Sequence, residues 1–223
     1  WRLLRGAKLL SMTTVSNLSP EFIHNTSGPK VTVCVVSYNQ KNFIAQCLQS
    51  ILDQEVDFSV EIVIADDHST DGTYELICEF EHRYPFIIRA FQHPNNIGAF
   101  RNFHFIHNLA KGEYVCHLDG DDYLLANKLR YQVSYMDANE ECGISWHRMD
   151  LLNERDGTRY PQHYEVDKLS SARFHIVDLV YTITLGIHSS KMYRRGKRVE
   201  TVAGLTALDF SENIQFLHQN KGW

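Results

Sequence analysis

Three carboxylates crowd into one turn of the sequence, where an apolar run at residues 114–118 is followed by Asp119, Asp121 and Asp122. A short apolar run beside turn residues predicts a buried strand, so the carboxylates are expected together at its exposed carboxyl end. Open α/β sheets bind ligands at that end. Because the three groups repel one another, the cluster favours a hard divalent cation, Mg²⁺ or Mn²⁺, with a phosphate ligand. The alternative for this segment alone is an acidic turn that caps the next helix.

Polar side chains also follow the first two predicted strands, whose β-branched residues are typical of strands covered on both faces. Tyr38 and Asn39 follow residues 31–37, and Asp66 and Asp67 follow residues 60–65. In a doubly wound sheet the carboxyl ends of neighbouring parallel strands converge on one crevice. Side chains that are far apart in the sequence are therefore expected to form one site with the acidic cluster.

The elements that must position these side chains alternate regularly up to residue 122. Strands are predicted at residues 31–37, 60–65, 86–91 and 113–118, and helices at residues 42–54, about 73–80 and 98–112. This alternation predicts right-handed β-α-β units and an α/β fold with a mainly parallel central sheet. Ser69 and Thr70 are the expected amino-terminal caps of the second helix. After residue 122 the pattern becomes less regular.

The composition is that of an ordinary globular chain. Of 223 residues, 43% are hydrophobic and 22% charged, and the formal net charge of −5 gives no general attraction to nucleic acid. The five cysteines are odd in number and form no CxxC pair, which indicates small core residues in a reducing compartment. No apolar run approaches the roughly 20 residues of a membrane span. We expect a cytoplasmic protein with at most peripheral membrane association, at the inner face of the membrane.

Two common phosphate-binding motifs are missing from the sequence. A dinucleotide enzyme should carry GxGxxG after its first strand and a nucleoside triphosphatase should carry GxxxxGK[ST], and neither occurs. A phosphate bound here is therefore expected to be held through a metal ion, side chains and a helix start.

Four ordered segments resemble one family. VTVCVVSYNQ at residues 31–40, VEIVIADDHSTDGT at 60–73, NNIGAFRN at 95–102 and KGEYVCHLDGDDYLLANKL at 111–129 are similar to the successive motifs of family 2 glycosyltransferases. The resemblance covers roughly residues 31 to 150. It implies the GT-A fold, a Rossmann-like three-layer sandwich with a smaller irregular acceptor-side region. It also implies a nucleotide-diphosphate sugar donor, a divalent metal held by a D-x-D element, and inverting transfer to an acceptor hydroxyl.

The resemblance assigns roles to individual residues of the donor site. Tyr38 and Asp66 are similar to the positions that contact the nucleobase, and Arg101, with Asn102 beside it, to the basic residue near the base and ribose. Asp119 resembles the ribose contact and first member of D-x-D, and Asp121 resembles the direct metal ligand. The expected donor-binding set is completed by Asn39, Asp67 and Gly120. For Asp67 the alternative is an organising role in its own turn, and for Arg101 it is a solvated helix face.

Inverting transfer also needs a general base opposite the leaving group, away from D-x-D. Asp209 is the best candidate, because TALDFSENIQFLHQ resembles the family's E-D element; Leu208 stands where the family has Glu. Glu212 lies on the same helical face and is the substitute. The alternative role for Asp209 is a helix cap. His188 is a candidate third metal ligand, since a neutral imidazole could complete a Mn²⁺ shell, and its alternative is a buried histidine bonded to backbone.

The predicted organisation is a leader followed by one domain. Residues 1–30 are expected to be a poorly structured leader, or in part sequence added ahead of a natural start at Met12. Residues 31–223 are expected to form a single catalytic domain, with a donor half at 31–122 and an acceptor half at 123–223, and we expect its carboxyl terminus to be truncated. We expect a saccharide or lipid-linked acceptor in surface polysaccharide synthesis.

Two other classes of function compete with this interpretation. One is a non-catalytic module that binds a sugar nucleotide without a base. The other is a D-x-D phosphatase, whose motif should end in Thr or Val where this chain has Tyr123, and should open the domain. A processive polymer synthase is rejected because Gly222 replaces the Arg of Q-x-x-R-W.

Overall fold

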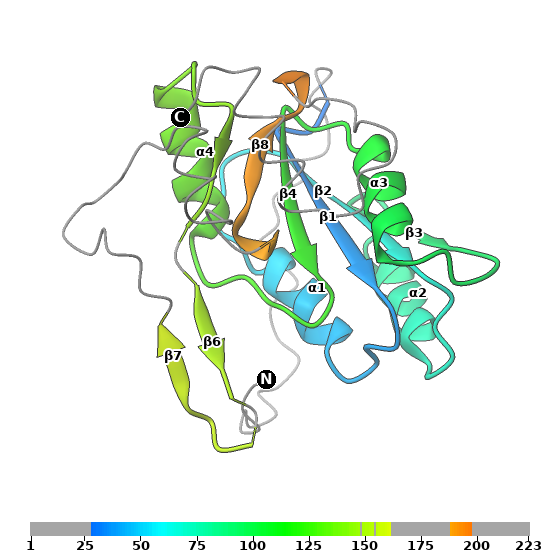
Figure 1. Ribbon diagram of the computed structural model, residues 1–223. Helices are drawn as coiled ribbons and strands as arrows, with labels where there is room; N and C mark the ends of the chain where they lie inside the picture. Colours follow the sequence, from blue (N-terminus) through cyan, green and yellow to red (C-terminus); the bar gives the residue numbers. More distant parts are fainter. Residues whose placement is uncertain (1–27, 148, 154, 162–187, 198–223) are drawn as a thin grey trace.

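The computed structural model describes residues 28–147, 149–153, 155–161 and 188–197 (Figure 1). Most of the predicted leader and the segment that carries Asp209 and Glu212 lie outside these residues. No helix in the described part of the chain is long and apolar enough to cross a membrane.

A six-stranded sheet with strand order β3-β2-β1-β4-β8-β5 forms the centre of the fold. Its bounds are β1 Val31–Ser37, β2 Val60–Asp66, β3 Ile88–Gln92, β4 Tyr114–Asp119, β5 Ile144–Ser145 and β8 Met192–Arg194. The pairs β1/β2, β1/β4 and β2/β3 are parallel, whereas β8 runs antiparallel to both β4 and β5. The predicted mainly parallel sheet is therefore confirmed, with an antiparallel extension at one edge.

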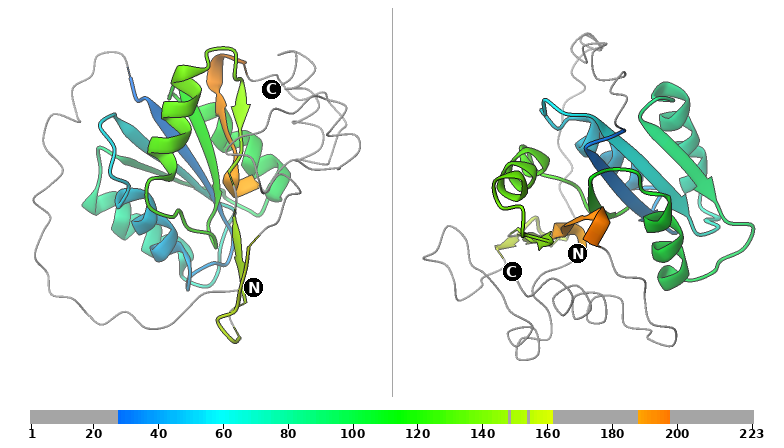
Figure 2. Two further views of the ribbon diagram at one scale, coloured as in Figure 1. Left: turned by 90° about the vertical axis from the view of Figure 1, so that its left-hand side faces the viewer. Right: turned by 90° about the horizontal axis from the view of Figure 1, so that it is seen from above.

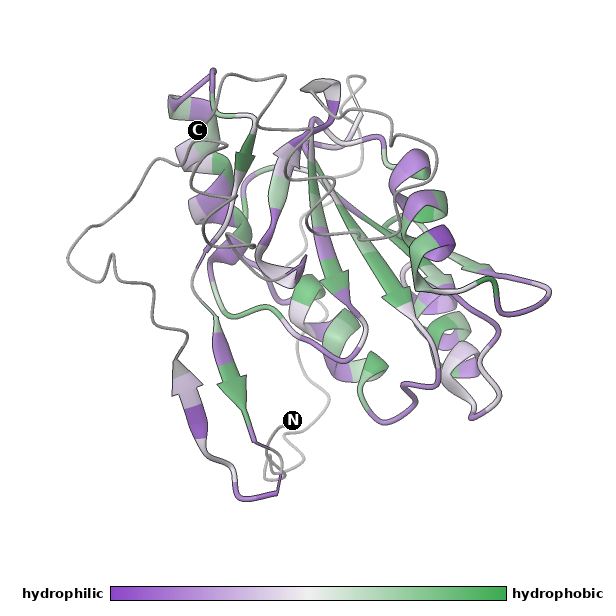
Figure 3. Cartoon of the chain, viewed as in Figure 1, coloured by the Kyte–Doolittle hydropathy of each residue, from purple (hydrophilic) through white to green (hydrophobic). Residues whose placement is uncertain are grey.

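Helices cover both faces of the sheet and give three layers (Figure 2). They are α1 Ile44–Leu52, α2 Thr73–Arg83, α3 Ala99–Leu109 and α4 Lys128–Ala138. Buried residues of α1, α2 and α4 pack with Val33 and Val35 on one face, whereas Ile106 of α3 packs with Cys34 and Val63 on the other. The two apolar clusters exist because alternate residues of a strand point to opposite faces. Hydropathy follows the same layers, with central strands mostly hydrophobic and helices of mixed faces (Figure 3).

The remaining described elements are short. β6 Asp150–Leu152 and β7 Arg159–Pro161 form an antiparallel pair of their own, which projects from the main sheet in Figures 1 and 2. Two 3₁₀ turns, His188–Ser190 and Arg195–Lys197, flank β8. The cysteines at 34, 47, 116 and 142 are buried free thiols, as small core residues should be.

The helix caps differ from the prediction. Helix α2 begins at Thr73 after Gly72, whose φ of 94° lies in the left-handed region, and the Thr73 N–H donates to the side chain of Asp71 at 3.0 Å. Ser69 and Thr70 lie before this turn, and Ser69 instead donates its hydroxyl to Asp66. The acidic cluster does not cap the next helix either, because α4 begins only at Lys128 after Asn127.

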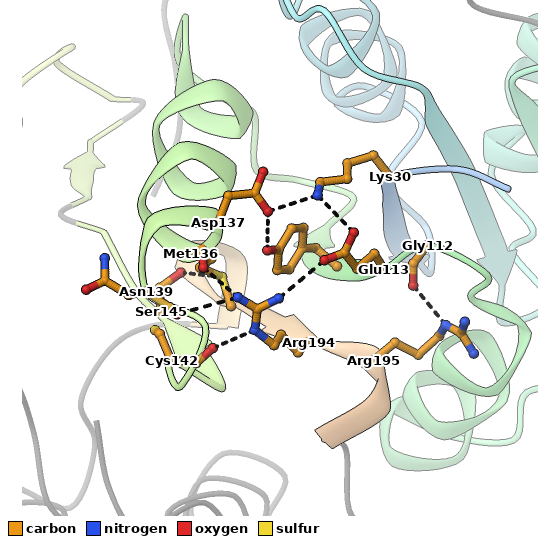
Figure 4. A network of polar contacts seen from close by, with 11 residues as sticks. Lys30, Gly112, Glu113, Met136, Asp137, Asn139, Cys142, Ser145, Arg194 and Arg195 are labelled. Atoms are coloured by element: carbon orange, nitrogen blue, oxygen red, sulfur yellow. Dashed lines mark hydrogen bonds and ion pairs between the residues drawn. The ribbon is translucent and has the colours of Figure 1, made fainter. Parts of the chain in front are cut away.

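A polar network joins the amino-terminal end of the sheet to α4 (Figure 4). Lys30 Nζ lies 2.8 Å from both Asp137 and Glu113, and the buried Tyr114 donates its hydroxyl to Asp137 at 2.5 Å. Arg194 adds an ion pair with Glu113 at 3.3 Å. Partial burial alone would raise the pKa of Asp137, but the hydrogen bonds from Lys30 and Tyr114 outweigh it and hold this pKa below its ordinary value. The network ties α4 and β8 to the central strands.

We predict that Asp137→Asn lowers the free energy of unfolding at neutral pH by about 1 kcal/mol. This value is the contribution of a hydrogen bond to a charged group, reduced because the Asp137 carboxyl is partly exposed to solvent. Because the native pKa is depressed, the stabilisation is present above the ordinary pKa of 3.8 and is lost as the pH falls through the native value. Urea unfolding at several pH values measures this, with the exposed Asp57→Asn as control. An equal loss of stability at every pH would contradict the explanation.

Candidate functional site

The site is built where β1 ends between its two parallel neighbours. The register aligns Ser37 with Asp66 on β2 and Val36 with Asp119 on β4. The Gly120 N–H donates to Val36 O at 2.8 Å, which continues the pairing one residue past β4. The arrows of β1 and β4 in Figure 1 point to the same edge. The polar strand ends predicted to converge therefore do so.

Asp66 is fully buried and all its described hydrogen bonds are internal. Its carboxylate accepts from the hydroxyls of Ser37 at 3.0 Å and Ser69 at 2.5 Å, from the Ser69 N–H at 2.8 Å and from Gln92 at 3.2 Å. Burying a carboxylate is costly unless its lone pairs are satisfied, and four donors meet that need. Asp66 holds the β2 end against β1 and β3.

The loop after β1 is joined to the loop after β2 by several short bonds. The Asn39 N–H donates to Ser69 Oγ at 2.8 Å, and its side chain accepts from the Thr70 N–H at 2.9 Å. The Lys41 N–H donates to Asp71 at 3.0 Å. Tyr38, next to Asn39, keeps 48% of its surface exposed. The two joined loops thus leave an aromatic ring exposed directly after the end of β1.

Asp67 and Asn102 hold the segment that leads into α3. The carboxylate of Asp67 accepts from the Ile97 N–H at 2.7 Å and the Gly98 N–H at 2.9 Å. The buried Asn102 donates to Ala65 O at 2.9 Å and lies 3.0 Å from His93 Nε2. Arg101, by contrast, is exposed on the helix surface. Of the predicted donor-site residues on this side, the structure thus turns Asp67 and Asn102 inward and Arg101 outward.

Asp119 is held from behind by β4 and by the turn before β8. His117 Nε2 lies 3.2 Å from Asp119 Oδ1, and the Ser189 hydroxyl donates to Oδ2 at 3.4 Å. The Asp119 N–H also donates to Ser189 Oγ at 3.1 Å. Burial alone would raise the pKa of Asp119, but the hydrogen bonds from His117 and Ser189 help to lower it below its ordinary value. Its side chain remains 38% exposed, so a hydrogen-bonded, ionised carboxylate stays accessible at the end of β4.

The other two acidic residues complete the turn. Asp121 is exposed, and the Asp122 N–H donates to Asp119 O at 2.9 Å. Burial, aided by the charges of Asp119 and Asp121, raises the pKa of Asp122 to about 6. Crowded carboxylates with exposed oxygen atoms are suited to binding a hard cation. Within the described residues no group of three or more His, Cys, Asp or Glu side chains could hold a metal ion by itself.

His188 begins the 3₁₀ turn whose next residue, Ser189, bonds Asp119. Its ring packs edge-on against His117 and Phe103, with centroid distances of 5.1 Å and 5.4 Å. Sequence reasoning missed His117 and gave Ser189 no role of its own. An imidazole inside an otherwise apolar strand was the available signal for His117. For Ser189 the only signal was its place next to His188.

Comparison with known proteins decides the family. The model of the family described as Glycosyl transferase family 2 matches residues 32–198. The chain belongs to this family.

The relatives are partly characterised. The uncharacterized protein Rv1520 of Mycobacterium tuberculosis is 35% identical over 166 residues, a match that covers 74% of this chain and 47% of the relative. The abequosyltransferase RfbV of Salmonella typhimurium is 34% identical over 133 residues, covering 58% of this chain and 40% of that protein. The chain spans about half the length of the curated relatives it matches.

The fold is shared with solved glycosyltransferase structures. S. aureus TarS 1–349 in complex with UDP-GlcNAc superposes with a TM-score of 0.59 at 24% identity, covering 75% of this chain and 46% of TarS. At this identity the likeness concerns the fold, and it confirms the predicted GT-A architecture.

We predict that Gly120→Ala destabilises the site. A Cβ at this position would lie 2.4 Å from Gln40 Oε1 and 2.9 Å from Val36 O, and the backbone oxygen cannot move without shifting β1. The free energy of unfolding should fall by about 1–3 kcal/mol through overpacking. Gly196→Ala is the control, because its Cβ meets nothing within 4 Å. Equal unfolding midpoints for the two variants would show that the close approach does not matter.

Proposed function

We propose that this chain carries the donor site of an inverting, metal-dependent glycosyltransferase that uses a nucleotide-diphosphate sugar, with UDP as the expected nucleotide. The observation that carries the proposal is the juxtaposition of Asp119 and Asp121 with the end of β1 in a member of glycosyl transferase family 2. Its fold is that of TarS, which binds UDP-GlcNAc.

In this proposal each donor-site residue has a physical task. The exposed ring of Tyr38 offers a stacking surface for the nucleobase, and the exposed side chain of Arg101 is proposed to meet the base and ribose. Asp66 is proposed to contribute to nucleobase binding indirectly, by holding the loops around the base. Its four described hydrogen bonds are all with residues of the protein. Asn39, Asp67, Asn102 and Gly120 fix the loops that line the crevice.

Asp121 and Asp119 would hold Mn²⁺ or Mg²⁺, with His188 beside them as a further candidate ligand. When bound, such a cation neutralises the charge that grows on the departing diphosphate. The chain's own contribution is orientation: His117 and Ser189 fix the Asp119 carboxylate before the donor arrives. Preorganised groups of this kind need no rearrangement during the reaction.

The acceptor half of the proposal depends on residues outside the described part of the chain. Asp209, with Glu212 as substitute, takes the proton of the acceptor hydroxyl, so that the sugar inverts in one displacement. The acceptor is proposed to be a saccharide or a lipid-linked oligosaccharide of a surface polysaccharide, made at the inner face of the membrane. The abequosyltransferase among the relatives supports a sugar-transfer role.

A thermal-shift screen tests donor binding directly. We predict that one of UDP-GlcNAc, GDP-mannose or a dTDP-sugar raises the unfolding temperature in the presence of Mn²⁺ and much less without it. Ligand at one hundred times its Kd stabilises a native state by about 2.7 kcal/mol. Asp121→Asn should remove most of the Mn²⁺-dependent shift, whereas the exposed Asp57→Asn should keep it. No shift with any donor and metal would contradict the proposal.

A second test separates an enzyme from a binding module. We predict that Asp209→Asn abolishes sugar transfer and leaves the Mn²⁺-dependent donor shift intact, because the base acts on the acceptor and not on the donor. Release of UDP in the presence of an acceptor extract measures turnover, and Glu212→Gln identifies the substitute base. Near-normal turnover in Asp209→Asn would remove Asp209 from the mechanism.

A further inference from the structure

Behind Asp119 runs a chain of hydrogen bonds that crosses three elements of the fold. The Tyr193 hydroxyl on β8 lies 2.6 Å from His107 Nδ1 on α3. His107 Nε2 lies 2.9 Å from His117 Nδ1 on β4. His117 Nε2 lies 3.2 Å from Asp119 Oδ1. A phenol, two imidazoles and the first carboxylate of D-x-D are thus joined in series.

The carboxylate end fixes the direction of every bond in this chain. An ionised carboxylate only accepts, so His117 Nε2 must carry the hydrogen. With its one hydrogen on Nε2, the His117 imidazole accepts at Nδ1 from His107 Nε2, which lies 2.9 Å away and must carry the next hydrogen. With that hydrogen on Nε2, the His107 imidazole accepts at Nδ1 from the Tyr193 hydroxyl, 2.6 Å away. Both histidines are therefore Nε2–H tautomers, and each donor has one acceptor.

Packing restricts the rotation of the side chains in this hydrogen-bond series. His107, His117 and Tyr193 are each at most 3% exposed. The ring of Phe103 stacks on His107 with centroids 3.9 Å apart and lies 4.8 Å from His117. Tyr193 is itself fixed in the β8 strand that pairs with β4. Rings wedged in this way hold the Nε2–H of His117 in one direction.

We propose that His117 is a positioning residue for the donor site, that it orients the Asp119 carboxylate toward the bound nucleotide and cation, and that His107 and Tyr193 orient His117. This inference rests on the proposed function, because it assigns Asp119 to the donor. It extends that function to three residues that do not contact the donor, and one of them lies on the β8 strand.

The consequence is a coupling between β8 and the donor. Hydrogen-bond partners behind a metal ligand fix its orientation, and their loss costs about 10- to 100-fold in metal affinity. Without the His117 N–H, the Asp119 carboxylate loses its Oδ1 partner and can turn within its crevice. In the described hydrogen bonds, the Tyr193 hydroxyl reaches Asp119 through His107 and His117, so removal of this hydroxyl should loosen the same carboxylate by a smaller factor.

The test measures UDP and Mn²⁺ affinity by calorimetry on the full chain. His117→Phe keeps a buried ring but removes the donor, and we expect about 10-fold weaker binding with a retained folded state. His117→Gln places an N–H near the position of Nε2 and should recover most of the affinity. Tyr193→Phe should weaken binding by a few-fold in the wild-type chain and not at all in His117→Phe. His104→Gln is the matched control, because His104 lies on α3 like His107 but is not a member of the described hydrogen-bond series.

Nitrogen NMR of the histidines gives a readout that does not depend on binding. The proposal expects Nε2–H tautomers for His107 and His117, and a change at His107 in Tyr193→Phe. Unchanged UDP affinity in His117→Phe, in a wild-type chain that binds UDP, would overturn this proposal and leave the donor function standing. An Nδ1–H tautomer for His117 would overturn it as well. Failure of the wild-type chain to bind any nucleotide sugar with Mn²⁺ would overturn the proposed function and this inference together.

Discussion

The parallel register of β1 with both of its neighbours is the constraint on which the rest of the structure depends. It aligns Ser37 with Asp66 and Val36 with Asp119, so three strand ends finish at the same level. Because of this alignment, the loops that follow β1 and β2 can form hydrogen bonds with each other. Gly120 can also approach Val36 within hydrogen-bonding distance. A slip of one residue would turn each of these side chains to the opposite face of the sheet.

The acidic residues at these strand ends fall into two physical groups. The carboxylates of the first group accept hydrogen bonds from N–H and O–H groups of neighbouring loops, and so hold these loops in place. They are Asp66, Asp67 and Asp71. Asp119 and Asp121 keep exposed side-chain surface at the end of β4. The first group holds the site rigid without needing a ligand, whereas the second carries charge that a cation and a diphosphate can use. The division explains how a site can be rigid and yet remain charged.

Much of the fold was predictable because alternating apolar runs and amphipathic helices are local signals. The convergence of Asp66 and Asp119 followed from the rule that parallel strands end at one edge. The roles of individual carboxylates did not follow, since the partners of Asp66 come from positions 29 residues before and 26 after it. Nor could the sequence place Tyr193 behind Asp119, because β8 joins the sheet from a distant segment. The missed caps of α2 have the same origin: Ser69 is drawn to a buried carboxylate rather than to a helix end.

The central claim is that a nucleotide diphosphate and a divalent cation bind at the carboxyl ends of β1 and β4. A crystal structure of the chain soaked with UDP and Mn²⁺ tests it most directly, since Mn²⁺ can be located by its anomalous scattering. The account predicts a Mn²⁺ peak in contact with Asp121 and with the diphosphate, and a uracil ring on the side of Tyr38. A nucleotide or Mn²⁺ bound away from these strand ends would contradict it.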